Sequence, residues 1–105
     1  MRRFYLLYMM KMADTLVKDA HVLVHPIRFR IVELLTRRPM HVSEISKTLG
    51  EERRLISYHL DLLEEYGFVD SKHEISELPK SKGKALRVYW TTDKVKDVIK
   101  EIKRM

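Results

Sequence analysis

The segment Val42–Val69 constrains the fold of this chain more than any other part of its sequence. Apolar residues recur at helical spacing on both sides of Gly50, which predicts two short helices joined by a tight turn. The second helix would present a polar outer face that begins with Arg53 and Arg54. A short helix, a glycine turn and a second helix with an arginine-bearing face form a helix-turn-helix layout. We therefore expect residues 52–66 to be a recognition helix.

The same pattern predicts the ends and the faces of the two helices. Ser43 is expected to cap the first helix, and Gly67 is expected to end the second. Three apolar residues of the second helix share one face and should be buried, namely Ile56, Leu60 and Leu63. The residues expected on its opposite face are Arg53, Arg54, Ser57, Tyr58 and Asp61.

Length and composition restrict the class of protein. With 105 residues the chain has room for one small domain, whose modest core usually gains from oligomerisation. Hydrophobic residues make up 45% and charged residues 34%, and no apolar run reaches the roughly 18 residues of a membrane span. The apolar run near the N-terminus is too short for a secretory signal, and no cleavage site follows it. We therefore expect a soluble, cytoplasmic protein with no membrane partner.

Several residue types and motifs are missing from the sequence. The absence of cysteine excludes disulfides, thiolate metal sites and cysteine nucleophiles. Asparagine and glutamine are also absent while Lys, Arg and Glu abound, which is typical of heat-adapted proteins, and we expect a thermophilic source. There is no phosphate-binding glycine loop, zinc-protease motif or recognisable catalytic triad, so we expect no enzyme activity.

The net charge of +6 and the isoelectric point near 9.7 indicate a polyanionic partner. The charge is unevenly distributed, because residues 39–69 carry three basic and six acidic groups. Positive charge lies instead in residues 1–38 and 70–105. The alternative is a basic protein whose charges are simply solvated.

The N-terminal segment predicts a long helix that ends near Val24. Apolar residues at alternating spacings of four and three form a heptad-like seam, namely Leu6, Met10, Ala13, Val17, Ala20 and Val24. Met9, Leu16 and Leu23 lie beside this seam and widen the apolar stripe. A stripe this broad suits a helix that contacts both its own domain and a second subunit. We prefer a dimer interface on this helix over burial within one monomer.

The next segments predict a second helix and a short strand. Pro26 is well placed to begin a helix that runs to Thr36, with Arg28 and Arg30 facing outward. Its inward residues are expected to be Ile27, Ile31, Leu34 and Leu35. Residues 40–42 are expected to form a short strand that pairs with a later hairpin.

Two alternating segments after Gly67 predict that hairpin, a β-wing. The alternating residues are Val69, Ser71, His73 and Ile75 on the outgoing strand and Leu86, Val88 and Trp90 on the returning strand. Pro79 and Gly83 turn the chain between them, and three lysines give the tip a positive charge. A last helix over residues 93–104 carries an apolar stripe that we expect to pack against the first helix of a partner.

These elements predict a mainly α fold with a small β-wing (α+β). We expect a dimeric winged helix-turn-helix with about five helices and a two- to three-stranded sheet. Within this single structural domain, residues 1–25 would be an N-terminal dimerisation helix and residues 26–92 a DNA-binding core. Residues 93–105 would be a C-terminal dimerisation helix.

Three motifs resemble those of ArsR-type winged-helix repressors and occur in that family's order. They are LVHPIRFRIVELL at residues 23–35, LGEERRLISYHLDLLEEYGFV at 49–69 and GKALRVYWTT at 83–92. The resemblance implies a repressor that binds DNA. It also implies an almost constant arginine at Arg28, which we interpret as an ion pair between helices, and a common histidine at His59. Glu52 departs from the family pattern, which usually has Ser, Thr or Asp there, and the cysteines of the family's metal sites are absent.

Arg53 and Arg54 would lie in the first turn of the recognition helix, where arginine can read the O6 and N7 atoms of guanine. Because the usual adenine readers Asn and Gln are absent, guanine contacts, thymine methyl groups or DNA shape would have to supply specificity. The residues expected to contact double-stranded DNA are Ser43, Ser46, Lys47, Arg53, Arg54, Ser57, Tyr58, His59, Lys80, Lys82, Lys84 and Arg87. A packing role for His59 is an equal alternative. The residues expected at a homodimer interface are Leu6, Met10, Ala13, Val17, Ala20, Val95, Val98, Ile99 and Ile102.

Neither metal binding nor any other cofactor is expected. Asp93, Asp97 and Glu101 share a helix face without a histidine, and His21 and His25 lie one turn apart without further ligands. Two functions compete with sequence-specific DNA binding. One is a protein-interaction module in a larger assembly, which an acidic helix-turn-helix would suit, and the other is an architectural DNA binder that is indifferent to sequence. No sequence motif indicates which effector, if any, the protein binds.

Overall fold

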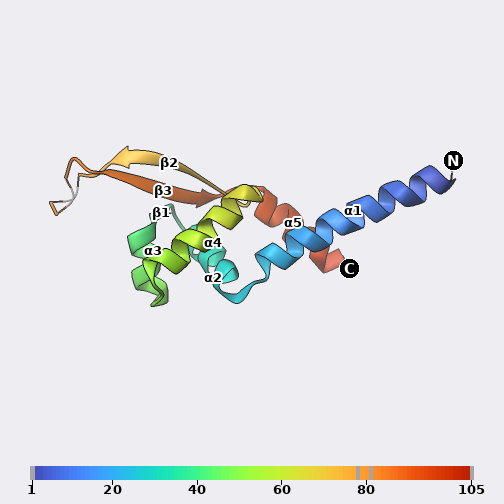
Figure 1. Cartoon of the computed structure of the whole chain (residues 1–105), viewed down its shortest axis with the longest axis horizontal. Coiled ribbons are helices and arrows are strands. Elements are labelled where there is room, and N and C mark those ends of the chain that lie inside the picture. The colour runs from blue at the N-terminus through green and yellow to red at the C-terminus, as the bar shows by residue number, and fades with distance from the viewer. Residues whose placement is uncertain (1, 78, 81, 105) are drawn as a thin grey trace.

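The computed structural model describes residues 2–77, 79–80 and 82–104, and these contain five helices and three strands. The helices are α1 (Arg2–Leu23), α2 (Pro26–Leu35), α3 (Val42–Leu49), α4 (Arg53–Glu65) and α5 (Lys94–Arg104). The strands are β1 (Met40–His41), β2 (Val69–Ile75) and β3 (Ala85–Thr91). The predicted mainly α fold with a small wing is confirmed (Figure 1).

The three strands form one antiparallel sheet in the order β1-β3-β2. Met40 of β1 is paired with Tyr89 of β3, so the predicted short strand does pair with the hairpin. The alternating residues Leu86, Val88 and Trp90 of β3 are half-buried, and Tyr89 between them is buried. Tyr89 and Arg87 point to the same side of β3, and Arg87 contacts Glu64 of α4. Helix α4 therefore covers the side of β3 on which Tyr89 is buried.

The core lies between α2, α3, α4 and the base of the sheet. The predicted inward residues of α4, Ile56, Leu60 and Leu63, are completely buried. Phe68 and Val69, where α4 turns into β2, are buried beside them. The other buried apolar residues are Val22, Leu23, Ile31, Val32, Leu34, Leu35, Met40, Ile45, Tyr89, Val95 and Val98.

Helix α3 has a different N-cap from the one predicted. His41, not Ser43, caps this helix, because its Nδ1 accepts a hydrogen bond from the backbone N–H of Glu44 at 3.4 Å. The Glu44 carboxylate in turn accepts from the backbone N–H of His41 and lies 2.9 Å from Arg38. Partial burial opposes ionisation of Glu44, but the hydrogen bonds from Arg38 and from the His41 backbone hold its pKa below the usual value.

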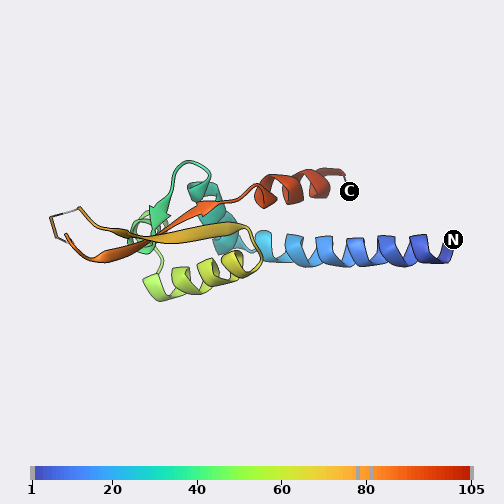
Figure 2. The same cartoon turned by 90° about the horizontal axis from the view of Figure 1, so that it is seen from above.

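Helix α1 gives the molecule its elongated shape, with extents of 63 × 24 × 22 Å. Its N-terminal end and the tip of the wing lie at opposite ends of the long axis (Figure 1). Helix α5 runs beside the C-terminal half of α1 (Figure 2). No helix in the described part of the chain combines the length and hydropathy needed to cross a membrane.

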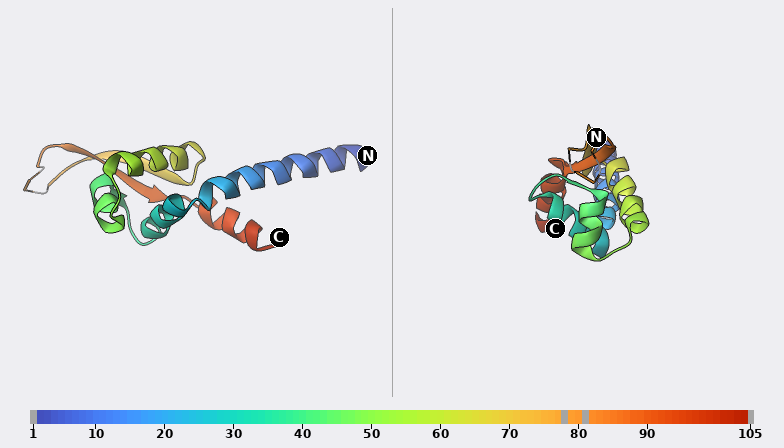
Figure 3. Two further views of the ribbon diagram at one scale, coloured as in Figure 1. Left: turned by 60° about the horizontal axis from the view of Figure 1, so that its bottom comes forward. Right: turned by 90° about the vertical axis from the view of Figure 1, so that its left-hand side faces the viewer.

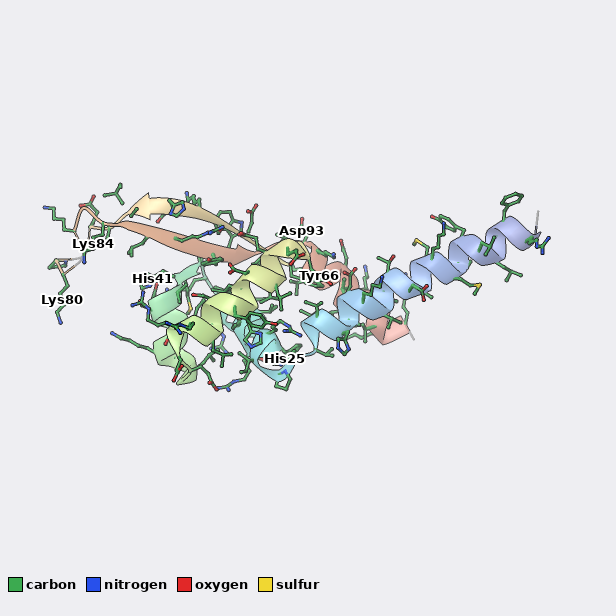
Figure 4. The ribbon with its side chains drawn as sticks, in the orientation of Figure 1. His25, His41, Tyr66, Lys80, Lys84 and Asp93 are labelled. Atoms are coloured by element: carbon green, nitrogen blue, oxygen red, sulfur yellow. The ribbon has the colours of Figure 1, made fainter. Side chains whose placement is uncertain are left out.

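Helix α5 is attached to its own domain, although we expected it to pack against a partner. The Lys94 ammonium lies 3.1 Å from the Asp19 carboxylate of α1 and donates to the Tyr66 carbonyl at 2.5 Å. Thr92, just before α5, donates from its hydroxyl to the Gly67 carbonyl at 2.5 Å. The junction of α4, β3 and α5 is marked by Tyr66 and Asp93 in Figure 4.

Candidate nucleic-acid interface

The outer face of α4 is polar and exposed, as predicted. Arg53 and Arg54 occupy its first turn with exposed side chains, and Tyr58 follows with 59% of its surface exposed. Ser57 on the same helix is half-buried. Glu52, the N-cap residue, makes no side-chain hydrogen bond to the helix. Arg53 and Arg54 are the first two residues of α4, and the free backbone N–H groups at this helix end add to their positive charge.

Helix α3 and the turn after it support α4 from one side. Gly50 ends α3 with a φ of 68°, a left-handed conformation that glycine adopts without strain. The hydroxyl of Ser46 donates to the Glu51 carbonyl at 2.5 Å, so its hydrogen is used to hold this turn. Lys47 is exposed, and Ser43 is half-buried. Of the three residues predicted here to contact phosphates, Lys47 is the most accessible.

The wing tip carries the predicted positive charge. Lys80, Lys82 and Lys84 are all exposed, and Lys80 and Lys84 mark the far end of the hairpin in Figure 4. Residues 78 and 81 of the turn lie outside the described residues. This end of the hairpin extends well beyond α4, so the lysines form a second cationic region apart from Arg53 and Arg54.

A polar network that we did not predict joins the wing to α4. Arg87 of β3 lies 2.7 Å from Oε1 of Glu64, and its Nε donates to the Ser71 hydroxyl at 2.8 Å. That hydroxyl donates in turn to the other oxygen of Glu64. We expected Arg87 to contact DNA, but the structure gives it an acidic partner within the chain. Glu64 and Arg87 have opposite charges, but they are 23 residues apart in the sequence, and only the packing of α4 against the β2–β3 hairpin brings them together.

Arg28 was predicted to face outward, and His59 was predicted either to contact DNA or to pack inside the domain; both residues are buried. Arg28 donates from Nε to the Val22 carbonyl at 2.7 Å, and its Nη1 lies 3.2 Å from Nδ1 of His59. The outward orientation predicted for Arg28 is wrong. Its partners are a backbone carbonyl and an imidazole, whereas we expected an ion pair with another helix. The burial of His59 favours the packing alternative over DNA contact.

The half-buried His25 joins this cluster at the α1–α2 junction (Figure 4). Its ring centroid lies 4.8 Å from that of His59, and its Nδ1 is buried without a hydrogen-bond partner among the described residues. Burial, with smaller effects of Arg28 and His21, lowers the pKa of His25. Burial and the nearby His25 and Arg28 also lower the pKa of His59, against an opposing effect of Glu51. Both imidazoles are therefore neutral at pH 7.

The predicted dimer residues fall into two groups. Leu6, Met10, Ala13 and Val17 are exposed along α1, and Ala20 is half-buried. On α5, Ile99 and Ile102 are half-buried against the core, and Val95 and Val98 are buried within the chain. Helices α1 and α5 diverge toward their free ends (Figure 3), and an apolar groove of about 580 Å³ between them is lined by Met9, Met12, Leu16 and Val98, among others.

Neither the three acidic residues of α5 nor the pair His21 and His25 belongs to a cluster of possible metal ligands among the described residues. In the described part of the chain, no three His, Asp or Glu side chains lie close enough together to hold a metal ion. The Asp93, Asp97 and Glu101 side chains are exposed along α5.

The helix-turn-helix of α3 and α4 beside the β2–β3 hairpin defines the chain as a winged helix-turn-helix protein. A family model described as a helix-turn-helix domain matches residues 23–72. An HTH-type transcriptional regulator of Methanocaldococcus jannaschii is 36% identical over 62 residues, which cover 59% of this chain and 64% of that relative. The chain thus matches somewhat less than two thirds of the relative's length.

Solved structures agree with this class. The transcriptional repressor BigR from Xylella fastidiosa is 25% identical, with a TM-score of 0.66 over 81% of this chain and 75% of that one. A homodimeric winged helix-turn-helix DNA-binding domain from Mycobacterium bovis, described as a possible ArsR-family regulator, is 18% identical. Its TM-score is 0.68 over 89% of this chain and 79% of that one. Both structures show the winged helix-turn-helix fold that the resemblance to ArsR-type regulators implied.

Proposed function

We propose that the chain is a transcription regulator, acting as a repressor, that binds a two-fold-symmetric site on double-stranded DNA as a homodimer. The observation that carries this proposal is the pair of exposed arginines in the first turn of α4, at the position from which recognition helices reach base edges. Two recognition helices would enter major grooves about one helical turn of DNA, or a whole number of turns, apart.

The charges around the proposed interface favour DNA binding more than the acidic composition of the helix-turn-helix suggests. Of the six acidic residues between 39 and 69, Glu44 is paired with Arg38 and Glu64 with Arg87. Among the residues that the structure describes, the exposed arginines of α4 and the wing lysines form no ion pair with an acidic side chain. Arg53 and Arg54 would then read guanine edges, while Lys47, Lys80, Lys82 and Lys84 would neutralise phosphates and set affinity.

The homodimer in this proposal is supported by the exposed apolar side chains of α1. Phe4, Leu6, Tyr8 and Met10 each expose more than half of their surface, and Val17 further along exposes 57%. Apolar patches of this size on one helix indicate a protein contact. A second copy of the chain is the partner that a two-fold-symmetric site requires.

Selection of bound sequences from a random duplex pool at about 150 mM salt tests the proposal. We expect an inverted repeat whose half-sites contain guanine. The control is the double variant Arg53→Ala and Arg54→Ala, which should lose the selected motif while it keeps salt-sensitive binding through the wing.

Two other results would replace the proposal. Retained DNA without any motif would identify an architectural binder that is indifferent to sequence. Failure to retain DNA at any salt concentration would assign the winged helix to protein contacts in a larger assembly. The direction of regulation is tested separately, because a repressor must lower transcription from a promoter that contains the selected site.

A further inference from the structure

We propose that two copies of the chain pair through α1 in an antiparallel register centred on residue 15. The N-terminal half of each α1 would then lie along the C-terminal half of the other. This inference rests on the homodimer of the proposed function, and it adds the surface and the register through which the two copies meet.

The surface is the seam that runs along α1 to Val24, just after the helix, and the rest of the chain covers it only partly, at Ala20. Leu6, Met10, Val17 and Val24 expose 61%, 62%, 57% and 56% of their surfaces. By contrast, the neighbouring Leu16 is half-buried and Leu23 is 1% exposed, because they face the chain's own domain. The chain's own domain thus covers the neighbouring face of α1 at Leu16 and Leu23, although Met9 on that face stays 48% exposed.

Side-chain size selects the antiparallel direction. With the two-fold axis at residue 15, Leu6 of one copy faces Val24 of the other, Met10 faces Ala20, and Ala13 faces Val17. Each layer then pairs a larger side chain with a smaller one, which keeps the distance between the helices nearly uniform. A parallel pairing would stack Met10 on itself and Ala13 on itself, so that bulky layers alternate with gaps.

The same seam selects the register. A shift by one heptad in either direction would leave two of the six seam residues of each copy without a facing partner. The register centred on residue 15 pairs all six. The opposed macrodipoles of two antiparallel helices also attract, whereas those of parallel helices repel.

Because the native chain contains no cysteine, introduced cysteines report the register directly. The double variant Leu6→Cys and Val24→Cys should form a covalent dimer on mild oxidation, with two disulfides for each dimer. Residues 6 and 24 are about 27 Å apart in one chain, because they are separated by 18 residues that rise about 1.5 Å each, so a disulfide within one chain is excluded. Each single variant should stay free of cross-links, as should Leu6→Cys combined with Lys18→Cys, whose second position lies on the polar face of α1.

Three outcomes would overturn the register. Cross-linking of Leu6→Cys alone would show a parallel pairing. A non-covalent dimer by sedimentation that no cysteine pair cross-links would place the interface elsewhere. A monomer at micromolar concentration would remove the dimer itself. Sequence selection on DNA with the unmodified chain tells these failures apart from failure of the proposed function, because it does not depend on the register.

Discussion

The guanidinium of Arg28 fixes the tautomer of His59. Arginine can only donate hydrogen bonds, so Nδ1 of His59, 3.2 Å from Nη1 of Arg28, must be the acceptor and the imidazole proton must be on Nε2. A second proton could bind only at Nδ1, where it would face the guanidinium. This contact links α2 to the recognition helix, and the bond from Arg28 to the Val22 carbonyl extends the link to α1.

This cluster predicts that the protein is destabilised as the pH falls below about 6.5. The pKa values of His25 and His59 are both below their ordinary value of 6.5 in the folded chain, chiefly because the imidazoles are buried. The unfolded chain therefore binds more protons in this range, and the free energy of unfolding decreases as the pH is lowered. Urea unfolding at half-unit steps from pH 8 to pH 5 measures the slope.

Two variants separate the contribution of the buried histidine from general titration. His59→Gln should flatten the slope between pH 6.5 and 5, because its amide does not titrate. His73→Gln, at an exposed position on β2, should leave the slope unchanged. An equal slope in all three proteins would show that the buried cluster does not control the pH response.

Removal of the Arg28 side chain should destabilise the fold strongly. Arg28→Met would leave the Val22 carbonyl and Nδ1 of His59 without their donor, and we expect a loss of about 2–3 kcal/mol in the free energy of unfolding. Arg30→Met, at an exposed position of the same helix, should change it by less than about 0.5 kcal/mol. Equal effects of the two substitutions would contradict a structural role for Arg28.

Arg28 also shows where sequence reasoning reached its limit. The periodicity of α2 correctly predicted that Ile31, Leu34 and Leu35 are buried, because apolar residues at helical spacing leave little choice of face. The same reasoning treated a charged residue as exposed, and it could not see that α1 and α4 supply two polar partners from outside the helix. Burial of a charge depends on tertiary contacts, which no local pattern contains.

The bounds of the recognition helix were predictable from the sequence, but the side-chain contacts around it were not. The boundaries of α4 agree with the expected residues 52–66 to within a residue at each end, because Gly50 and Gly67 flank it. The hydrogen-bonded contact between Glu64, Ser71 and Arg87 depends on strand register, and the cap of α3 by His41 depends on an imidazole in place of the usual hydroxyl. The predicted DNA contacts of Arg53, Arg54 and the wing lysines stay predictions.

The α4 arginines and the wing lysines should affect DNA binding in different ways. Arg53→Ala or Arg54→Ala should cost about 1–3 kcal/mol on the selected site and relax its sequence preference. Lys82→Ala should weaken binding to all duplexes similarly and reduce the slope of log affinity against log salt by about 1. Lys100→Ala, exposed on α5, is the matched control and should do neither. Loss of sequence preference in the lysine variant instead would reverse the assigned roles.

The Glu64–Arg87 contact should hold the wing in place more than it stabilises the fold. Both side chains are partly exposed, so Glu64→Gln should cost no more than about 1 kcal/mol of unfolding free energy. Amide hydrogen exchange in β2 and β3 should nevertheless accelerate, and affinity for the selected DNA should fall. Glu74→Gln removes the comparable Lys72–Glu74 pair, which lies within β2, and should have neither effect. Unchanged exchange in Glu64→Gln would show that backbone pairing alone positions the wing.

The packing of seam residues by size gives the last prediction. In the antiparallel register Met10 faces Ala20 of the partner, so Ala20→Met alone should crowd that layer and Met10→Ala alone should leave a cavity. Each single variant should therefore raise the dissociation constant of the dimer. The double variant Met10→Ala and Ala20→Met exchanges the two side chains across the interface and should restore much of the lost affinity. Sedimentation equilibrium on the four proteins measures the coupling between the positions. Losses that simply add in the double variant would mean that the two residues do not meet.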